Sequence, residues 1–269
     1  MRKYFYNVSF PKLGINIKIC PVALTIGNIN IRWYGIFIAI GFFLAYMYVF
    51  FRAKDFKIDR DKLTDIIIAG GILGIICARI YYIVFYPGDF YKTNPYKIFS
   101  IYEGGIAIYG GIIGGILGGS IIAKLKKVEI LPLFDITSFG LLIGQAIGRW
   151  GNFFNQEAFG GETELPWGMA SEATKNIAVH PCFLYESLWC TLGFLILHIL
   201  SLNKRLKNGQ YFAFYLFWYG VGRIYIESLR TDSLIFMNWK ISQLVSLFLI
   251  FIAILFFILT KPRKKTSYN

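Results

Sequence analysis

The chain is poor in charge, cysteine and histidine, and each shortage excludes a class of protein. Charged residues make up 16% of the 269 residues, whereas 56% are apolar and 19% aromatic. This balance excludes a disordered chain, because so much apolar surface has to be buried. Four cysteines are too few for a small scaffold held by disulfides. With two histidines and no cysteine pair at ligand spacing, we expect no metal site and no cofactor.

Long apolar runs dominate the sequence instead, and the mean hydropathy is +0.55. Several runs approach the roughly 20 residues that a helix needs to cross a bilayer. Seven candidate spans are predicted, at 33–51, 63–85, 105–123, 133–150, 183–200, 211–227 and 241–260. The predicted fold is therefore an all-α integral membrane protein, a bundle of about seven transmembrane helices that forms a single polytopic domain over residues 1–269.

The basic residues are distributed unevenly between the predicted loops. They concentrate after the first, third, fifth and seventh spans, at 52–62, 124–127, 204–207 and 261–265. Basic residues favour the cytoplasmic side, so the N-terminus is predicted outside, the C-terminus in the cytoplasm, and the loop at about 151–182 outside. This distribution accounts for much of the net charge of +13 without a nucleic-acid partner, and none is expected.

The densest polar signal is at 148–160, where the sequence reads GRWGNFFNQEAFG. An arginine at the centre of a transmembrane helix costs roughly 2.5–3.5 kcal/mol on insertion scales, so Arg149 at the edge of a span suggests a function. Its planar guanidinium suits a phosphodiester, and Asn152 and Asn155 can donate further hydrogen bonds. The alternative is a polar helix end capped by amides, with Arg149 extended toward the interface.

Two further arginines, Arg79 and Arg223, also lie within predicted spans. Glu227 follows Arg223 by four residues and shares its helix face. The pair could simply tie two helices together. The predicted topology, however, brings Arg223 into the same outer half of the membrane as Arg149, where two cations could receive the phosphate of a lipid headgroup.

Glycines recur every fourth residue in the third span, at 110, 114 and 118 and again at 111, 115 and 119. Such small residues let transmembrane helices approach closely. These two rows of glycines therefore predict tight helix packing rather than a binding site.

Four other motifs accompany the one at 148–160. They are RWYG at 32–35, YEGGIAIYGG at 102–111, HPCFLYE at 180–186 and YGVGRIYIE at 219–227. Together, in this order, the five motifs resemble the prolipoprotein diacylglyceryl transferase family from about residue 27 to the final span. The resemblance implies transfer of the diacylglyceryl group of phosphatidylglycerol to the thiol of the lipobox cysteine of bacterial prolipoproteins. A thioether would form and glycerol phosphate would be released.

The resemblance also implies the partners and the location. The partners would be phosphatidylglycerol, the signal peptides of prelipoproteins and the lipid bilayer. The location would be the bacterial cell membrane, with the active site toward the external face.

Two groups of site residues follow from the resemblance. The expected catalytic residues are Tyr34, Tyr109, Asn152, Glu157, Arg223 and Glu227. The residues expected to bind phosphatidylglycerol are Arg149, Arg223, Asn155, Gly160 and Tyr219. Tyr34 could instead be an aromatic interface anchor, and Glu157 could simply cap a loop.

Tyr109 stands where many members of the family have histidine. Because an unperturbed tyrosine titrates near pH 10, it is a poor base at neutral pH but a good hydrogen-bond donor. We therefore expect Tyr109 to position the substrate rather than to accept the thiol proton.

The main alternative function is a transporter or channel for an anionic solute, with arginines along its path. The sequence shows no convincing inverted repeat, and its polar residues cluster at one face of the predicted bundle. An intramembrane protease is less well supported still, because the sequence offers no Ser-His or paired-Asp arrangement.

Overall fold

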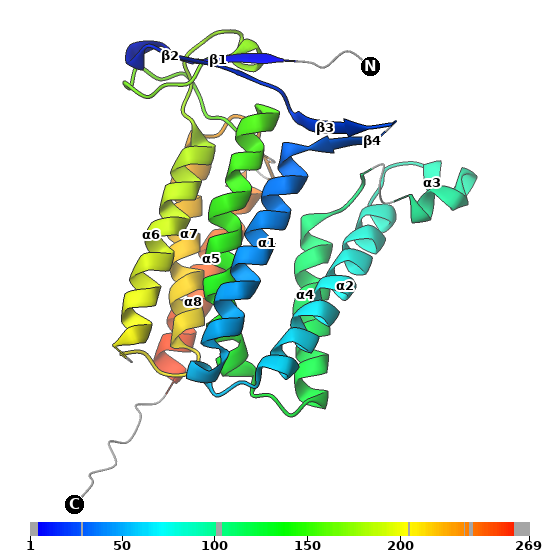
Figure 1. The fold of residues 1–269 in the computed structure, drawn as a ribbon, viewed down its shortest axis with the longest axis vertical. Helices are drawn as coiled ribbons and strands as arrows, with labels where there is room; N and C mark the ends of the chain where they lie inside the picture. The colour runs from blue at the N-terminus through cyan, green and yellow to red at the C-terminus, as the bar shows by residue number, and fades with distance from the viewer. Residues whose placement is uncertain are drawn as a thin grey trace, which may run out of the picture. The chain divides into compact units, whose positions relative to one another are not determined.

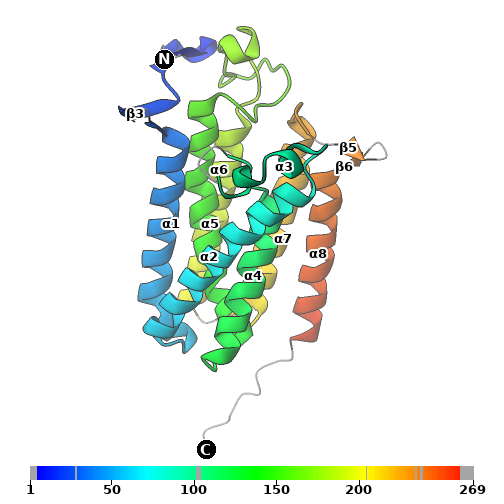
Figure 2. The same ribbon diagram turned by 90° about the vertical axis from the view of Figure 1, so that its right-hand side faces the viewer.

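The computed structural model describes residues 5–27, 29–100, 104–203, 205–233, 235–236 and 239–260. The chain divides into two compact units, each built mainly from long helices (Figures 1 and 2). The main unit contains Met1–Val49 and Phe134–Asn269. The small unit contains Phe50–Leu133.

Five long helices provide the framework of the main unit, where they lie side by side (Figures 1 and 2). They are α1 (Trp33–Arg52), α5 (Ile130–Asn155), α6 (Cys182–Leu202), α7 (Gln210–Leu229) and α8 (Ile241–Leu259). The first residues of α5 and the last of α1 belong to the small unit. Large apolar side chains such as Phe42 and Phe43 are exposed on α1, as expected of a helix that faces lipid.

The prediction of an all-α fold is wrong in one respect, because the described chain also contains three two-stranded antiparallel sheets. They pair β1 (Tyr6–Phe10) with β2 (Ile15–Ile19), β3 (Val22–Ile26) with β4 (Ile29–Arg32), and β5 (Ile235–Phe236) with β6 (Trp239–Lys240). The first four strands lie in the leading segment, where isoleucines alternate with polar residues. This period of two favours strands. A search for long apolar runs does not find them, because each strand has only four or five residues.

The β1–β2 hairpin covers the loop between α5 and α6. Ser9 and Ala170 exchange two backbone hydrogen bonds of 2.8 Å, and Val8 is buried with Met169 and Phe183. Because α5 continues to Asn155, this loop begins about five residues later than the predicted 151. Gly151, the first residue of the predicted loop, lies inside α5.

Six described helical segments are long and apolar enough to cross a membrane. They are Trp33–Phe56, Arg60–Val84, Ile108–Leu125, Ile130–Asn155, Cys182–Leu202 and Ile241–Leu259. Helix α7 coincides with the remaining predicted span, but it carries buried polar side chains, among them Gln210 and Glu227. A helix that packs its polar face against other helices can be less apolar than its neighbours. The chain is a multi-pass membrane protein.

The small unit consists of α2 (Arg60–Val84), α3 (Phe90–Thr93), α4 (Ile108–Leu125) and two 3-10 helices, Ala53–Phe56 and Pro95–Phe99. The glycine rows of α4 pack against α2, which confirms the predicted role in helix packing. A methyl group added at Gly114 would lie 2.5 Å from both the carbonyl oxygen of Leu73 and the Cβ of Cys77. Only glycine permits this approach of the two helices.

Candidate functional site

The centre of the site is Glu186, a carboxylate that three helices and a loop enclose. Glu186 lies in the second turn of α6 and is buried. Its Oε2 is 2.8 Å from Nη2 of Arg149, and its Oε1 is 2.9 Å from Nη1 of Arg223. Arg230, which follows α7, places Nη1 3.9 Å from the same Oε1. The carboxylate of Glu186 therefore lies close to three arginines, one each from α5, α7 and the loop after α7.

The directions of the helices bring these charges together. Arg149 and Arg223 each lie six residues before the C-terminal end of their helices, α5 and α7. Glu186 lies four residues after the first residue of α6. The three helix ends meet at Glu186, so consecutive helices α5, α6 and α7 run antiparallel.

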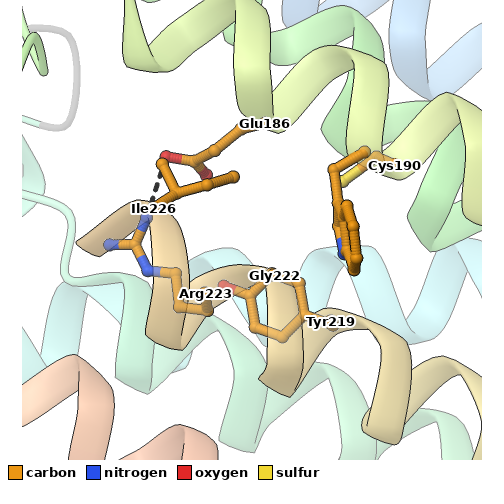
Figure 3. Close-up of a pocket in the computed structure, with 7 residues that line it drawn as sticks. Glu186, Cys190, Tyr219, Gly222, Arg223 and Ile226 are labelled. Carbon is orange, nitrogen blue, oxygen red and sulfur yellow. Dashed lines mark hydrogen bonds and ion pairs between the residues drawn. The ribbon is translucent and has the colours of Figure 1, made fainter. Parts of the chain in front are cut away.

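The predicted pairing of Arg223 with Glu227 is confirmed. Nη2 of Arg223 lies 2.7 Å from Oε2 of Glu227, which is 3% exposed. The guanidinium of Arg223 thus lies between two buried carboxylates, one on its own helix and one on α6, as Figure 3 shows for Glu186. The predicted convergence of Arg149 and Arg223 is also confirmed, because both contact Glu186.

The cluster continues into the segment after α7. Arg230 donates two hydrogen bonds of 2.9 Å to the carboxylate of Asp232, and these hold the pKa of Asp232 below its ordinary value. The ammonium of Lys240 donates to the carbonyl oxygens of Glu227 and Arg230, both at 2.6 Å, and so caps the end of α7.

We call Arg149, Glu186, Arg223, Glu227, Arg230, Asp232 and Lys240 the ion cluster. Its four cations exceed its three carboxylates, which leaves an excess of positive charge that favours an anionic ligand.

A small pocket of about 10 Å³, room for about one water molecule, opens beside the ion cluster. It is lined by Glu186, Trp189, Cys190, Tyr219, Gly222, Arg223 and Ile226. Figure 3 shows Arg223 and Glu186 at one side of this pocket and Cys190 at the other. The pocket is thus charged at one side and apolar or aromatic elsewhere.

Trp189, which lines the pocket, packs against a second tryptophan, Trp218. The rings of Trp189 on α6 and Trp218 on α7 stack with centroids 4.3 Å apart. Each indole N–H donates a 2.9 Å hydrogen bond to the main-chain carbonyl of the other residue. This reciprocal pair fixes α6 against α7 one turn away from Glu186 and Arg223.

A second polar group lies at the end of α5. The side-chain amides of Asn152 and Asn155 both donate to Oε1 of Glu157, at 2.9 and 3.2 Å. The residues flanking Glu157, Gln156 and Ala158, have φ of 51° and 58°, in the left-handed region that is uncommon for residues other than glycine. Among the described residues, Oδ1 of Asn155 is buried without a hydrogen-bond partner. That oxygen is an acceptor without a partner, which is uncommon for a buried polar atom.

Tyr34 lies in the first turn of α1 and packs on Gly151 of α5. Its side chain is 37% exposed, and a methyl group added at Gly151 would lie 2.6 Å from its Cδ2. Gly151 therefore allows Tyr34 to lie directly against the helix that carries Arg149.

Replacing Gly151 by alanine is expected to destabilise the protein by about 1–3 kcal/mol, because the new methyl group overpacks the contact with Tyr34. Gly144→Ala on the same helix is the matched control, since nothing lies within 4 Å of a Cβ there. Thermal unfolding in the same detergent compares them. Equal melting temperatures for the two variants would show that the contact with Tyr34 is not tight.

Gly160 reaches the ion cluster through its backbone. It pairs with Arg230 in an isolated β-bridge, and its N–H donates to the carbonyl of His180 at 2.9 Å. A Cβ at this position would lie 2.8 Å from Cβ of His180 and 2.9 Å from the carbonyl oxygen of Leu229. Gly160 therefore holds the loop between α5 and α6 against the end of α7.

Tyr109 belongs to the small unit, where it lies in the first turn of α4. It is 45% exposed, and its ring centroid lies 6.5 Å from that of Tyr81. In the motif at 102–111, Tyr102 and Glu103 lie outside the described residues.

Arg79, the third arginine within a predicted span, makes a different set of contacts. It is 7% exposed and donates to the carbonyl oxygens of Ile98, Lys97, Gly104 and Gly105 at 2.5–2.9 Å. Through these hydrogen bonds Arg79 fixes residues 97–98 and 104–105 against α2, so its role in the structure is to position this part of the chain.

The sequence interpretation missed Glu186, Arg230, Asp232 and Lys240. Glu186 carried a usable signal, because a carboxylate within a transmembrane helix is as unusual as an arginine there. Arg230, Asp232 and Lys240 carried none, because in the sequence they are ordinary charges of a polar loop.

The model of the family "Prolipoprotein diacylglyceryl transferase" matches residues 21–259 of the chain. A protein from Listeria innocua is 41% identical over 257 residues, which cover 92% of each chain. Proteins from Clostridium novyi and Staphylococcus aureus are 40% and 41% identical over 258 and 244 residues. These cover 93% and 87% of this chain and 99% and 86% of the relatives. All three relatives bear the name phosphatidylglycerol–prolipoprotein diacylglyceryl transferase.

Proposed function

The chain belongs to the prolipoprotein diacylglyceryl transferase family, and on that premise we propose how its ion cluster serves the reaction. The enzyme transfers the diacylglyceryl group of phosphatidylglycerol to a prolipoprotein. The observation that carries the proposal is the meeting of Arg149 and Arg223 on the single carboxylate of Glu186.

The reaction forms one bond and breaks one. The sulfur of the lipobox cysteine bonds to the glyceryl carbon that carries the phosphate, while the bond from that carbon to the phosphate oxygen breaks. The bonding electrons leave with the oxygen of glycerol phosphate, and in the overall balance the proton lost by the thiol is gained by that phosphate. The product is a thioether. Because negative charge develops on the leaving phosphate, cations positioned beside it stabilise the transition state.

Arg149 and Arg223 are the cations proposed to bind the phosphate. A guanidinium has five N–H donors, and among the described residues Arg149 uses one terminal nitrogen, Nη2, on Glu186. Its remaining donors can form the two-pronged contact that suits a phosphate. Arg223 lines the pocket and reaches the phosphate from the opposite helix. The same positive field lowers the pKa of the incoming thiol and raises its thiolate fraction.

The other proposed site residues surround these cations. Glu227 holds Arg223 in place, and Tyr219 lines the pocket beside it. Asn152, Asn155 and Glu157 are proposed to contact the headgroup, and the unpartnered Oδ1 of Asn155 supports this role. Tyr34 packs on the same helix end, and Gly160 acts through its backbone. Glu186 and Arg230 are added as positioning residues, because they contact the arginines.

We propose that residues 1–269 form one polytopic domain of seven spans in the bacterial cell membrane. The antiparallel order of α5, α6 and α7 supports α7 as a span in addition to the six long apolar helical segments. Arg205 and Lys207 lie between α6 and α7, at the ends of these helices away from Glu186. The positive-inside rule then favours a cytoplasmic C-terminus, an external N-terminus and a site near the external face. Lys204 and 261–265 lie outside the described residues.

The direct test is incubation of the purified protein with labelled phosphatidylglycerol and a lipobox peptide. Lipidated peptide and glycerol phosphate are expected in equal amounts, and a peptide with serine in place of the lipobox cysteine is the control. Flux of an anionic solute through reconstituted vesicles, without lipidated peptide, would support the transporter instead.

Arg149→Lys is expected to lower the transfer rate strongly although the charge is kept, because lysine cannot make the planar two-pronged contact. The rate of peptide lipidation is measured per amount of folded protein. Arg205→Lys, in the exposed loop between α6 and α7, is the matched control and should leave the rate unchanged. A near-normal rate in both Arg149→Lys and Arg149→Gln would contradict phosphate binding by Arg149.

Tyr109→Phe is expected to keep substantial activity, with a loss smaller than the roughly 10²-fold that removal of a general base causes. The reason is that a positive field ionises the substrate thiol, whose ordinary pKa is about 8.5, before a phenol near 10. Tyr109→His should also be tolerated, since imidazole can donate a hydrogen bond. Base catalysis would be indicated if Tyr109→Phe were folded but inactive and recovered at high pH.

A further inference from the structure

The β3–β4 hairpin has one apolar and one polar face. Directly paired residues of antiparallel strands lie on the same face, and Leu24 is paired with Ile31. Leu24 and Ile26, which shares its face, are 52% and 59% exposed. On the opposite face Thr25 is paired with Asn30, and the Thr25 hydroxyl donates a 2.9 Å hydrogen bond to Oδ1 of Asn30.

The hairpin is joined directly to a membrane-spanning helix. Strand β4 ends at Arg32 and α1 begins at Trp33, with no residue between them. The N–H of Trp33 donates a 3.0 Å hydrogen bond to the carbonyl of Pro21, the residue before β3. Both ends of the hairpin are therefore held at the first residue of α1. Figure 1 shows the two strands running across the end of that helix instead of continuing along it.

The residues at this junction are those of a membrane interface. Trp33 and the half-exposed Tyr34 begin α1, and such aromatic residues gather at the level of the lipid headgroups. Arg32 is exposed beside them and carries the charge that attracts anionic headgroups. The hairpin thus begins at the end of a membrane span, at the level of the lipid headgroups.

We propose that the β3–β4 hairpin lies in the membrane interface, with Leu24 and Ile26 in contact with lipid acyl chains and Thr25 and Asn30 toward water. A sheet of two strands cannot bury its own apolar face, and lipid covers that face without any further protein. A peptide could instead add to a free strand edge, but edge pairing uses the backbone and leaves the exposed leucine and isoleucine unexplained. The proposal rests on α1 being a membrane span and is independent of the transfer chemistry.

Photocrosslinking from single positions of the full-length protein tests this proposal. Leu24, Ile26 or Thr25 is replaced by p-benzoylphenylalanine, and the protein is reconstituted in bilayers of phosphatidylglycerol and phosphatidylcholine. Phe43, which is 59% exposed on α1, is the positive control for contact with lipid. After irradiation, mass spectrometry is expected to find lipid adducts at positions 24 and 26 at yields close to that at 43. The yields at positions 24 and 26 should be several-fold above the yield at position 25.

Three outcomes would overturn the proposal. Adducts at position 43 without adducts at 24 and 26 would place the hairpin out of reach of lipid. Equal yields at 24 and 25 would show that the hairpin has no preferred face toward lipid. A crosslink at 24 that forms to an added lipobox peptide in place of lipid would make the hairpin a peptide-binding surface. Because all these side chains are exposed, the bulky photoreactive group can be accommodated, and unchanged melting temperatures confirm that each variant is folded.

Discussion

Replacing Arg223 by alanine is expected to lower the rate of diacylglyceryl transfer about 10²- to 10³-fold, the loss typical of removing one donor that stabilises developing negative charge. Arg223 contacts Glu186 at 2.9 Å and Glu227 at 2.7 Å, and it lines the pocket beside them. Both carboxylates hold the guanidinium in one orientation, so its charge needs no rearrangement when the leaving phosphate becomes negative. Arg223→Lys should lie between alanine and the original residue, because it keeps the charge but loses the fixed geometry.

The competing explanation is that Arg223 only ties α6 to α7. Removing one partner of a buried ion pair destabilises a protein by about 3–5 kcal/mol, and the loss of activity would then follow the loss of folded protein. Melting temperature and transfer rate are therefore measured on the same preparations. A rate per folded molecule that stays within about tenfold of the original would remove Arg223 from the chemistry, since the expected loss is far larger.

Glu186→Leu is expected to destabilise the protein by about 3–5 kcal/mol, the largest effect on stability among these variants. Glu186 is 5% exposed and is the shared partner of Arg149, Arg223 and Arg230. Leucine has a similar length but no charge, so it leaves the arginines without their common partner in a poorly solvated site. Glu186→Gln should be milder, because an amide oxygen still accepts hydrogen bonds from them.

The matched control for this prediction is Glu162→Leu, since Glu162 is an exposed carboxylate of the loop between α5 and α6. Chemical unfolding in detergent, followed by loss of helical circular dichroism, measures the difference in unfolding free energy. If Glu186→Leu were as stable as Glu162→Leu, the arginines would be sufficiently solvated without Glu186. The central position of this carboxylate would then be a geometric coincidence.

The contrast between three arginines shows how far the sequence could predict the site. Arg79, Arg149 and Arg223 look alike in the sequence, because each lies within or at the edge of an apolar segment. In the structure Arg79 donates to four backbone carbonyls, whereas Arg149 and Arg223 share Glu186 and lie at the ion cluster. Hydropathy does not separate these cases, although the family motifs include Arg149 and Arg223 and leave out Arg79. The partner groups of Arg79 are backbone atoms, which every residue possesses.

The sequence by itself determined the helices of this protein, its family and the pairing of Arg223 with Glu227. Apolar runs specify membrane helices because the bilayer leaves the backbone no other partners, and a spacing of four residues places two side chains on one helix face. The tertiary structure alone decided that Glu186 joins Arg149 to Arg223 and that Lys240 caps α7. These contacts join residues more than ten positions apart in the chain, from different helices and loops. They depend on how those elements pack, which the spacing within any one of them does not specify.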